Sequence, residues 1–265
     1  MNTFQYHRAT SLADAVAKLR ASAEGRALAG GMTLLPTMKL GLAQPPDLVD
    51  LGTLVELRGI RRSGDRLVIG AMTRHAEVAA SADVKGAIAA LAALATGIGD
   101  PQVRNRGTLG GSVANNDPAA DYPAAVLGLN ATVQTDRRSI TADKFFTGMF
   151  ATALDAGELI KAIEFTVPKC AAYAKFPSPA SRYAMVGVMV ADFGGEVRVA
   201  VTGAAPGVFR VAAFEAALKK RFAPEALDGL SVPPGGLVSD LHGSAAYRAH
   251  LVGVMARRAV AAALR

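Results

Sequence analysis

The sequence predicts a mixed α+β fold in two parts that meet near residue 170. Short apolar segments alternate with helix-spaced segments up to that point, strand-like segments separated by glycine turns follow it, and helical segments close the chain. The chain has 265 residues, 51% hydrophobic and 19% charged. It is therefore long enough to bury a full core, as one large domain or two modest ones.

The first hundred residues predict alternating helices and strands. Ser11 is a favourable N-cap, and the apolar residues after it recur at helical spacing. Thr33 has the same position before a shorter apolar helix, and Gly97 is a typical helix end. The predicted elements are a helix over 12–22, a short buried strand at 27–31, a helix after Thr33, strands at 48–51 and 66–73, and a helix over 81–98.

Residues 100–135 combine turn formers with a second pair of adjacent glycines, which predicts a long ordered loop. An apolar helix is expected from about Pro123 and a strand from about Ala131. Both belong to the first part of the chain.

Beyond Pro168 the segments become strand-like and are separated by Gly-Gly and Pro-Gly turns, which predicts an antiparallel sheet. Two helices follow, and the second carries Leu251, Val254 and Met255 on one face. The predicted elements are strands at 188–193, 197–201 and 207–211, a helix over 212–221 and a helix that begins near Ala245.

Few residues suit metal or disulfide chemistry. Cys170 is the only cysteine, so no intramolecular disulfide is possible and an iron–sulfur cluster, which commonly needs four thiolates, is not expected. The four histidines are scattered without the short spacings of zinc sites. We therefore expect no metal on this chain.

The net charge of +7 is compatible with a nucleic acid, an anionic ligand or solubility alone. The basic residues are dispersed and do not alternate with aromatic ones, so a nucleic-acid-binding module is a disfavoured alternative. The N-terminus lacks a signal-peptide core, and the apolar stretch at 88–94 is too short for a membrane span. A cytoplasmic protein is expected.

Two glycine pairs, Gly30/Gly31 and Gly110/Gly111, each follow an apolar residue. Glycines let the backbone approach a ligand closely, and exposed amides and hydroxyls suit a diphosphate, so the two loops could hold one dinucleotide. The alternative is that both pairs are only tight turns. The glycine signatures of Rossmann dehydrogenases and of P-loop NTPases are absent, and so is the nucleophile elbow of hydrolases.

Four segments resemble the FAD-binding medium subunit of molybdenum hydroxylases, the xanthine dehydrogenase and aerobic carbon monoxide dehydrogenase families. They are AGGMTLLPTMKL at 29–40, NRGTLGGSVANNDPAADYPAA at 105–125, YAKFPSPASRYAMVGV at 173–188 and YRAHLVGVMARRA at 247–259. The resemblance implies a vanillyl-alcohol-oxidase/PCMH-type FAD-binding domain over 1–168. It also implies a smaller α+β C-terminal domain over 169–265, with a three-stranded antiparallel sheet and helices.

The resemblance implies that both loops wrap the FAD diphosphate. Met32 and Ser112 depart from the residues common at their positions, but a backbone amide donates whatever the side chain is. Arg104 and Arg106 could offset the diphosphate charge, although solvated loop arginines are the commoner case. The implied loop residues are Ala29, Gly30, Gly31, Met32 and Thr33 in the first loop, and Thr108, Leu109, Gly110, Gly111 and Ser112 in the second.

Four more positions match residues that approach the flavin in this family, and each has a plainer alternative. Asp121 would accept hydrogen bonds from ribityl or adjacent hydroxyls, or it is a helix N-cap. Lys175 would lie at the polar edge of the isoalloxazine, or it is a solvated strand end. Tyr183 would shield one ring face, or it is a core aromatic. Ile160 would contact the ring, or it is an apolar core residue.

The resemblance also implies the role of the chain. It would carry FAD, accept electrons from a [2Fe-2S] small subunit, and pass them to an external acceptor, while a molybdopterin-binding large subunit oxidises the substrate in a heterotrimer. No catalytic residue and no metal would belong to this chain. A free-standing flavoprotein oxidoreductase of the same fold is an alternative, disfavoured because the chain lacks a cap domain and a catalytic base.

Overall fold

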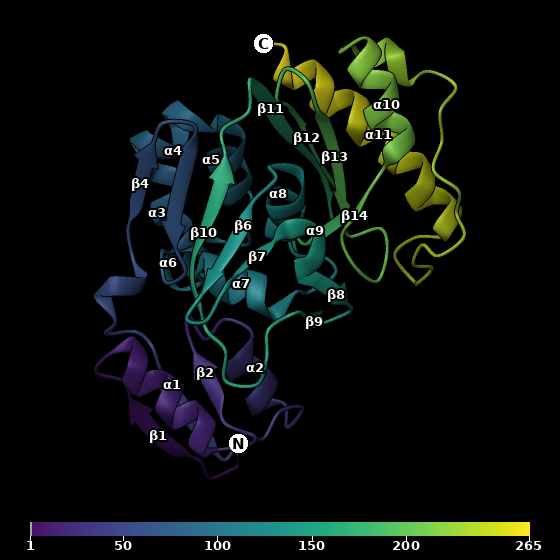
Figure 1. Cartoon of the computed structure of the whole chain (residues 1–265). Helices are drawn as coiled ribbons and strands as arrows, with labels where there is room; N and C mark the ends of the chain where they lie inside the picture. Colours follow the sequence, from purple (N-terminus) through teal and green to yellow (C-terminus); the bar gives the residue numbers. More distant parts are fainter. Residues whose placement is uncertain (1) are drawn as a thin grey trace.

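The computed structural model describes residues 2–265, and its elements form three successive units along the chain (Figure 1). The first two lie before residue 167 and contain the two glycine pairs, and the third begins with the strand at Cys170. The mixed α+β class predicted from the sequence is confirmed. No helix among residues 2–265 is long and apolar enough to cross a membrane.

The N-terminal unit is a three-stranded parallel sheet in the order β1-β3-β2. The helix α1 packs on it through Ala15, Val16 and Leu19, and Ser11 accepts a hydrogen bond from the Asp14 amide at 3.1 Å, as an N-cap should. Its elements are β1 (Gln5–Arg8), α1 (Leu12–Ala21), β2 (Arg26–Leu28), α2 (Leu34–Lys39), β3 (Asp47–Asp50) and the 3-10 turn η1 (Val55–Leu57).

The middle unit is a five-stranded antiparallel sheet in the order β4-β5-β10-β6-β7, accompanied by helices. Its central strand, β10, comes last of the five in the sequence and pairs with β5. The helices and strands between β5 and β10 therefore begin and end at neighbouring strands of the sheet. Its elements are β4 (Ile60–Ser63), β5 (Arg66–Gly70), α3 (His75–Ala80), α4 (Ala82–Ala87), α5 (Ala89–Thr96), α6 (Pro101–Arg106), α7 (Leu109–Asn115), α8 (Tyr122–Gly128), β6 (Thr132–Thr135), β7 (Ser139–Thr141), α9 (Ala142–Phe145), β8 (Phe146–Gly148), β9 (Ala151–Thr152) and β10 (Ile160–Thr166).

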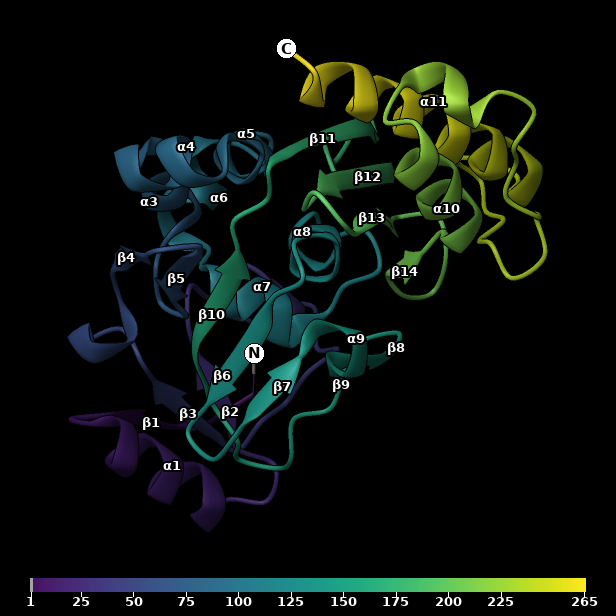
Figure 2. The ribbon, with the colours of Figure 1, turned by 45° about the horizontal axis from the view of Figure 1, so that its top comes forward.

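The C-terminal unit is a four-stranded antiparallel sheet, β11-β12-β13-β14, with both faces covered. Val186, Val188 and Val190 pack in one core with α10 and α11, whereas Met189 and Ala191 belong to the opposite core, which contains α8. Figure 2 shows α10 and α11 on one side of this sheet and α8 on the other. Its elements are β11 (Cys170–Pro177), β12 (Ala184–Asp192), β13 (Val197–Thr202), β14 (Phe209–Arg210), α10 (Ala212–Lys220), the 3-10 turn η2 (Pro224–Leu227) and α11 (Ala245–Ala263).

Several sequence-based expectations need correction. The helix expected over 81–98 is two helices, because Ile88 takes a non-helical conformation (φ −143°, ψ 77°) and its side chain is buried in the main core. The long loop expected over 100–135 contains α6 and α7, whose first turns are capped by the side chains of Asp100 and Thr108. The C-terminal sheet has a fourth strand, β11, which the predicted three did not include. Thr33 precedes α2, but its side chain makes no capping hydrogen bond.

Glu158 anchors the turn between β6 and β7 to the start of β10, and we expect its charge to support the fold. Burial alone would raise the pKa of Glu158, but hydrogen bonds from Arg138 (2.9 Å), the Asp155 amide (2.8 Å) and Thr135 (2.7 Å) lower it to about 2. A depressed carboxyl pKa contributes stability that is complete above the ordinary value of 4.5 and is lost as the pH falls toward 2.

Glu158→Gln should therefore lower the free energy of unfolding at pH 7 by about 1–3 kcal/mol, the typical cost of breaking a hydrogen-bonded charge pair. Urea titrations at pH 7, 4.5 and 3 should show that the difference from the wild type shrinks as the pH falls. The exposed Glu24→Gln is the matched control and should change the free energy of unfolding little at any of these pH values. If Glu158→Gln lowers the free energy of unfolding by the same amount at all three pH values, the charge of Glu158 does not support the fold.

Candidate functional site

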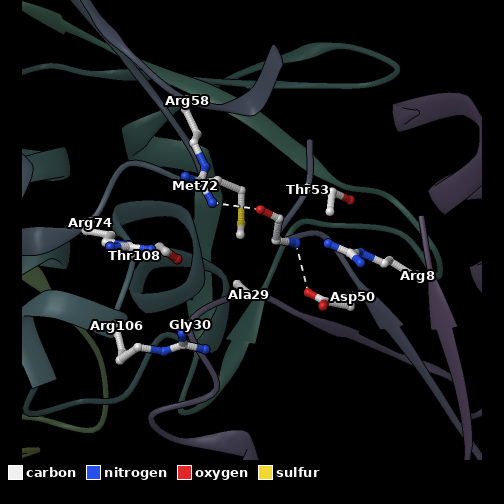
Figure 3. Close-up of a pocket in the computed structure, with 11 residues that line it drawn as sticks. Arg8, Ala29, Gly30, Asp50, Thr53, Arg58, Met72, Arg74, Arg106 and Thr108 are labelled. Atoms are coloured by element: carbon white, nitrogen blue, oxygen red, sulfur yellow. Dashed lines mark hydrogen bonds between the residues drawn. The ribbon is translucent and has the colours of Figure 1, made fainter. Parts of the chain in front are cut away.

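The two glycine loops are in direct contact. Gly30 follows β2, and a Cβ placed on it would lie 2.2 Å from the Arg106 carbonyl oxygen, just before the second loop. A Cβ on Gly111 would lie 3.4 Å from the Ala29 Cβ. Figure 3 shows Ala29 and Gly30 beside Arg106 and Thr108. Two segments far apart in the sequence thus form one backbone surface.

Each loop is shaped by its local sequence. Gly31 has a φ of 73°, in the left-handed region that glycine adopts without steric cost, and this turns the chain from β2 into α2. Two backbone hydrogen bonds hold the second loop against the segment after β5. The Leu109 amide donates to the Thr73 carbonyl (3.0 Å) and the Gly110 amide donates to the Ala71 carbonyl (2.8 Å).

The loops differ in the donors they offer. Within residues 2–265, the amides of Gly30, Gly31, Met32 and Thr33 make no hydrogen bond to another group of the chain. The amides of Leu109 and Gly110 are already used, and the Gly111 amide donates to the Thr108 hydroxyl at 3.2 Å. The Ser112 amide donates to the Thr108 carbonyl at 3.1 Å. The expectation of exposed amides in both loops is therefore wrong for these four residues of the second loop, Leu109 to Ser112.

A second polar cluster surrounds Asp121, which is 5% exposed at the start of α8. The Tyr173 hydroxyl donates to Oδ1 at 2.5 Å, and Lys175 Nζ donates to Oδ2 at 3.1 Å. Asp121 occupies the N-cap position of α8, but its side chain makes no capping hydrogen bond, so capping does not account for its burial. Burial raises the pKa of Asp121 above its ordinary value, and the Lys175 ammonium and Tyr173 hydroxyl partly offset this rise.

Lys175 also contacts two further segments of the chain. Its Nζ also donates to the Gly97 carbonyl at 2.8 Å and to the Arg182 carbonyl at 3.1 Å, and its side chain is only 12% exposed. The alternative of a solvated strand end is therefore wrong. Tyr183, next to Arg182, is 45% exposed, so it is not a core aromatic. The structure thus brings Lys175, Asp121 and the Tyr183 segment together.

Ile160 lies apart from this cluster. It is 5% exposed, pairs with Thr135 in the sheet of the middle unit, and packs in the main core. Its burial agrees with the alternative of an apolar core residue.

Sequence reasoning missed Tyr173 and His75. Tyr173 and Lys175 are two residues apart on β11 and therefore face the same side, a signal that could have paired both with Asp121. Burial, with a smaller effect of Arg104, lowers the pKa of His75 to about 4, and its Nδ1 has no hydrogen-bond partner within residues 2–265. His75 packs behind Gly107, where an added Cβ would lie 2.5 Å from Nε2.

The two loop arginines have different environments. Arg104 Nη1 donates to the carbonyls of Ile98 and Gly99, each at 3.0 Å, so it closes the turn before α6. Arg106 instead lines an open cavity of about 210 Å³ beside Gly30 (Figure 3). The cavity lies between the N-terminal and middle units.

A family described as "FAD binding domain in molybdopterin dehydrogenase" matches residues 2–169. The carbon monoxide dehydrogenase medium chain of Hydrogenophaga pseudoflava is 36% identical, over 98% of this chain and 96% of the relative. The nicotine 6-hydroxylase medium subunit of Paenarthrobacter nicotinovorans is 35% identical, over 97% of this chain and 95% of the relative.

Solved structures agree with these relatives. Carbon monoxide dehydrogenase from Hydrogenophaga pseudoflava, in a form lacking the Mo-pyranopterin moiety, superposes with a TM-score of 0.89 at 37% identity, covering 99% of this chain and 98% of that one. Quinoline 2-oxidoreductase from Pseudomonas putida 86 has a TM-score of 0.87 at 28% identity, covering 99% of this chain and 97% of that one.

Proposed function

Because this chain belongs to the family of FAD-binding domains of molybdopterin dehydrogenases, we propose that it is the FAD-carrying electron-transfer subunit of a molybdenum-dependent hydroxylase. The observation that supports this most is the contact of two glycine loops beside four free amides, from Gly30 to Thr33. Free amides pointing from a tight loop are donors for a diphosphate.

The residues present fit the cofactor. Gly30 through Thr33 would donate to the diphosphate, and the second loop, from Thr108 to Ser112, would set the position of the first through backbone contact. Asp121, held by Tyr173, would accept from the ribityl or an adjacent hydroxyl, with the partly exposed Tyr183 as the expected ring contact. Bound FAD supplies the redox chemistry, accepting electrons singly or in pairs.

Lys175 would provide the positive charge of the site. Its ammonium is held by one carboxylate and two carbonyls and is mostly shielded from solvent. A cation fixed at the edge of a ring stabilises negative charge gained on reduction and so favours the reduced state.

The proposed partners are a molybdopterin-binding large subunit and a [2Fe-2S] small subunit, with an external acceptor taking the electrons. The names of the relatives support this, since two are medium chains or subunits and another solved relative is titled as a Cu,Mo-CO dehydrogenase. The chain itself needs no acid or base for substrate chemistry in this role. The cytoplasmic location stays a prediction.

The test is purification of the chain from its native source. We expect flavin absorbance that is released as FAD on denaturation, together with co-purifying molybdenum and iron–sulfur subunits. An FAD protein that comes without partners and oxidises a small alcohol or amine by itself would favour the free-standing oxidoreductase. A chain that takes up no FAD, even in excess, would refute the proposal.

A further inference from the structure

The C-terminal sheet contains a small space that only a glycine leaves open. Tyr173 and Lys175 lie on the same side of β11, and Lys175 pairs with Gly187 on the neighbouring strand β12 (Figure 1). A Cβ placed on Gly187 would clash with the Tyr173 hydroxyl oxygen and would lie 2.8 Å from its Cζ. Gly187 is the only residue of β12 without a side chain. A glycine inside a strand often marks the close approach of another group, and here that group is the tyrosine hydroxyl.

The hydroxyl that occupies this space donates to a buried carboxylate. Tyr173 Oη lies 2.5 Å from Asp121 Oδ1, and Lys175 Nζ lies 3.0 Å from Oδ1 and 3.1 Å from Oδ2. Both carboxylate oxygens therefore have a partner. Burial and the charge of Asp121 raise the pKa of Tyr173 well above its ordinary value, so the hydroxyl stays protonated and neutral. It supplies the carboxylate with a donor and adds no charge.

No other group around Asp121 supplies such a donor in the part of the chain that the structure describes. Lys175 is the only cation that lowers the pKa of Asp121, and its ammonium is shared with two carbonyls. Neither Tyr122 nor Tyr183 donates to Asp121, and the charge of Asp117 near Tyr183 is negative. The helix α5, which packs on β11, has no charged side chain. Against burial, which raises the pKa of Asp121, only the ammonium and one tyrosine hydroxyl favour its charged form.

We propose that Tyr173 is a positioning residue that keeps the Asp121 carboxylate ionised and fixed against Lys175, in the space that Gly187 provides. A hydrogen bond to the charged form favours that form and sets the direction in which the carboxylate points. An ionised carboxylate offers all its lone pairs to a hydroxyl group of a ligand, whereas a protonated one does not. That ligand is the bound cofactor, and this last step rests on the proposed function.

The charge state of Asp121 can be measured on the full chain without cofactor. In protein labelled with a carbon isotope at the aspartate carboxyls, NMR gives the pH midpoint of each carboxyl, and Asp121→Asn identifies the signal of Asp121. We expect Tyr173→Phe to raise the Asp121 midpoint by about one pH unit or more, because it removes one hydrogen bond to a charged group.

The matched control is Tyr122→Phe. It removes a buried tyrosine hydroxyl next to Asp121 in the sequence, and this hydroxyl has no hydrogen-bond partner within residues 2–265. The Asp121 midpoint should therefore stay at its wild-type value. The inference is overturned if Tyr173→Phe also keeps the wild-type midpoint, or if Tyr122→Phe shifts it as much as Tyr173→Phe does.

Gly187→Ala tests the same hydrogen bond without deleting the hydroxyl. Its Cβ would displace the Tyr173 hydroxyl from Asp121, so the Asp121 midpoint should rise here too. The double variant Gly187→Ala/Tyr173→Phe should titrate like Tyr173→Phe alone, because the hydrogen bond can be lost only once. Thermal unfolding checks that each variant is folded. If Tyr173→Phe does not fold, Gly187→Ala decides, and an unshifted midpoint in that variant overturns the inference.

FAD titrations of the same variants separate this inference from the proposed function. At pH values below the raised Asp121 midpoint, we expect Tyr173→Phe to bind FAD about tenfold more weakly than the wild type, and above it with wild-type affinity. Weakening by the same factor at every pH would show that Tyr173 only supports packing, and would overturn the positioning role. A wild type that takes up no FAD refutes the proposed function, while the carboxyl titration still decides what Tyr173 does.

Discussion

A single methyl group at Gly30 is expected to weaken FAD binding by roughly a hundredfold. The Cβ of Gly30→Ala would lie 2.2 Å from the Arg106 carbonyl oxygen and 2.8 Å from the Gly107 Cα. Both are backbone atoms, so no rotamer change relieves the clash, and the loops must separate. Two lost hydrogen bonds to a charged group, at about 1.5 kcal/mol each, correspond to that hundredfold change.

The measurement is titration of the apo chain with FAD, followed by the quenching of flavin fluorescence. Gly86→Ala is the matched control, because an added Cβ there meets nothing within 4 Å. The control should bind FAD like the wild type. If Gly30→Ala also binds FAD like the wild type, contact between the loops does not shape the site.

Asp121→Ala should lower the free energy of unfolding by about 3–5 kcal/mol, as expected when one partner of a buried ion pair is removed. The Lys175 ammonium, 3.0 Å from Asp121 Oδ1, would remain only 12% exposed and would keep only carbonyl partners. The Tyr173 hydroxyl would lose its acceptor as well. Urea denaturation at pH 7 measures the change.

The double variant Asp121→Ala/Lys175→Met separates charge burial from cofactor binding. It removes both charges, so we expect it to recover most of the stability while FAD binding stays impaired. Glu225→Ala is the control for a solvent-exposed pair, 3.8 Å from Arg221, and should cost less than about 1 kcal/mol. Equal losses for Asp121→Ala and Glu225→Ala would show that the buried pair has no special role.

Local patterns predicted much of the fold. The helix after Ser11 and the last helix, α11, both begin at a serine whose side chain accepts an amide hydrogen bond, and such caps depend on only a few neighbouring residues. The strands β12 and β13 were expected because apolar runs between glycine turns indicate strands.

Patterns failed where a distant contact outweighed local preference. Ile88 interrupts a run of good helix formers because its side chain is buried in the main core. The strand β11 has few fully buried residues, and its alternating small and polar side chains give a weak strand signal. Its pairing with β12 is what holds it extended.

For the site, the sequence by itself determined the glycine pairs and the matching family motifs, because close backbone approach requires glycine at particular positions. Tertiary structure alone decided that Tyr173 and Lys175 share one buried carboxylate and that Gly187 leaves room for the Tyr173 hydroxyl. These arrangements depend on where each chain segment ends in space. The neighbouring residues in the sequence do not specify these positions, because burial and charge–charge interactions depend on separation in space and not on separation along the chain.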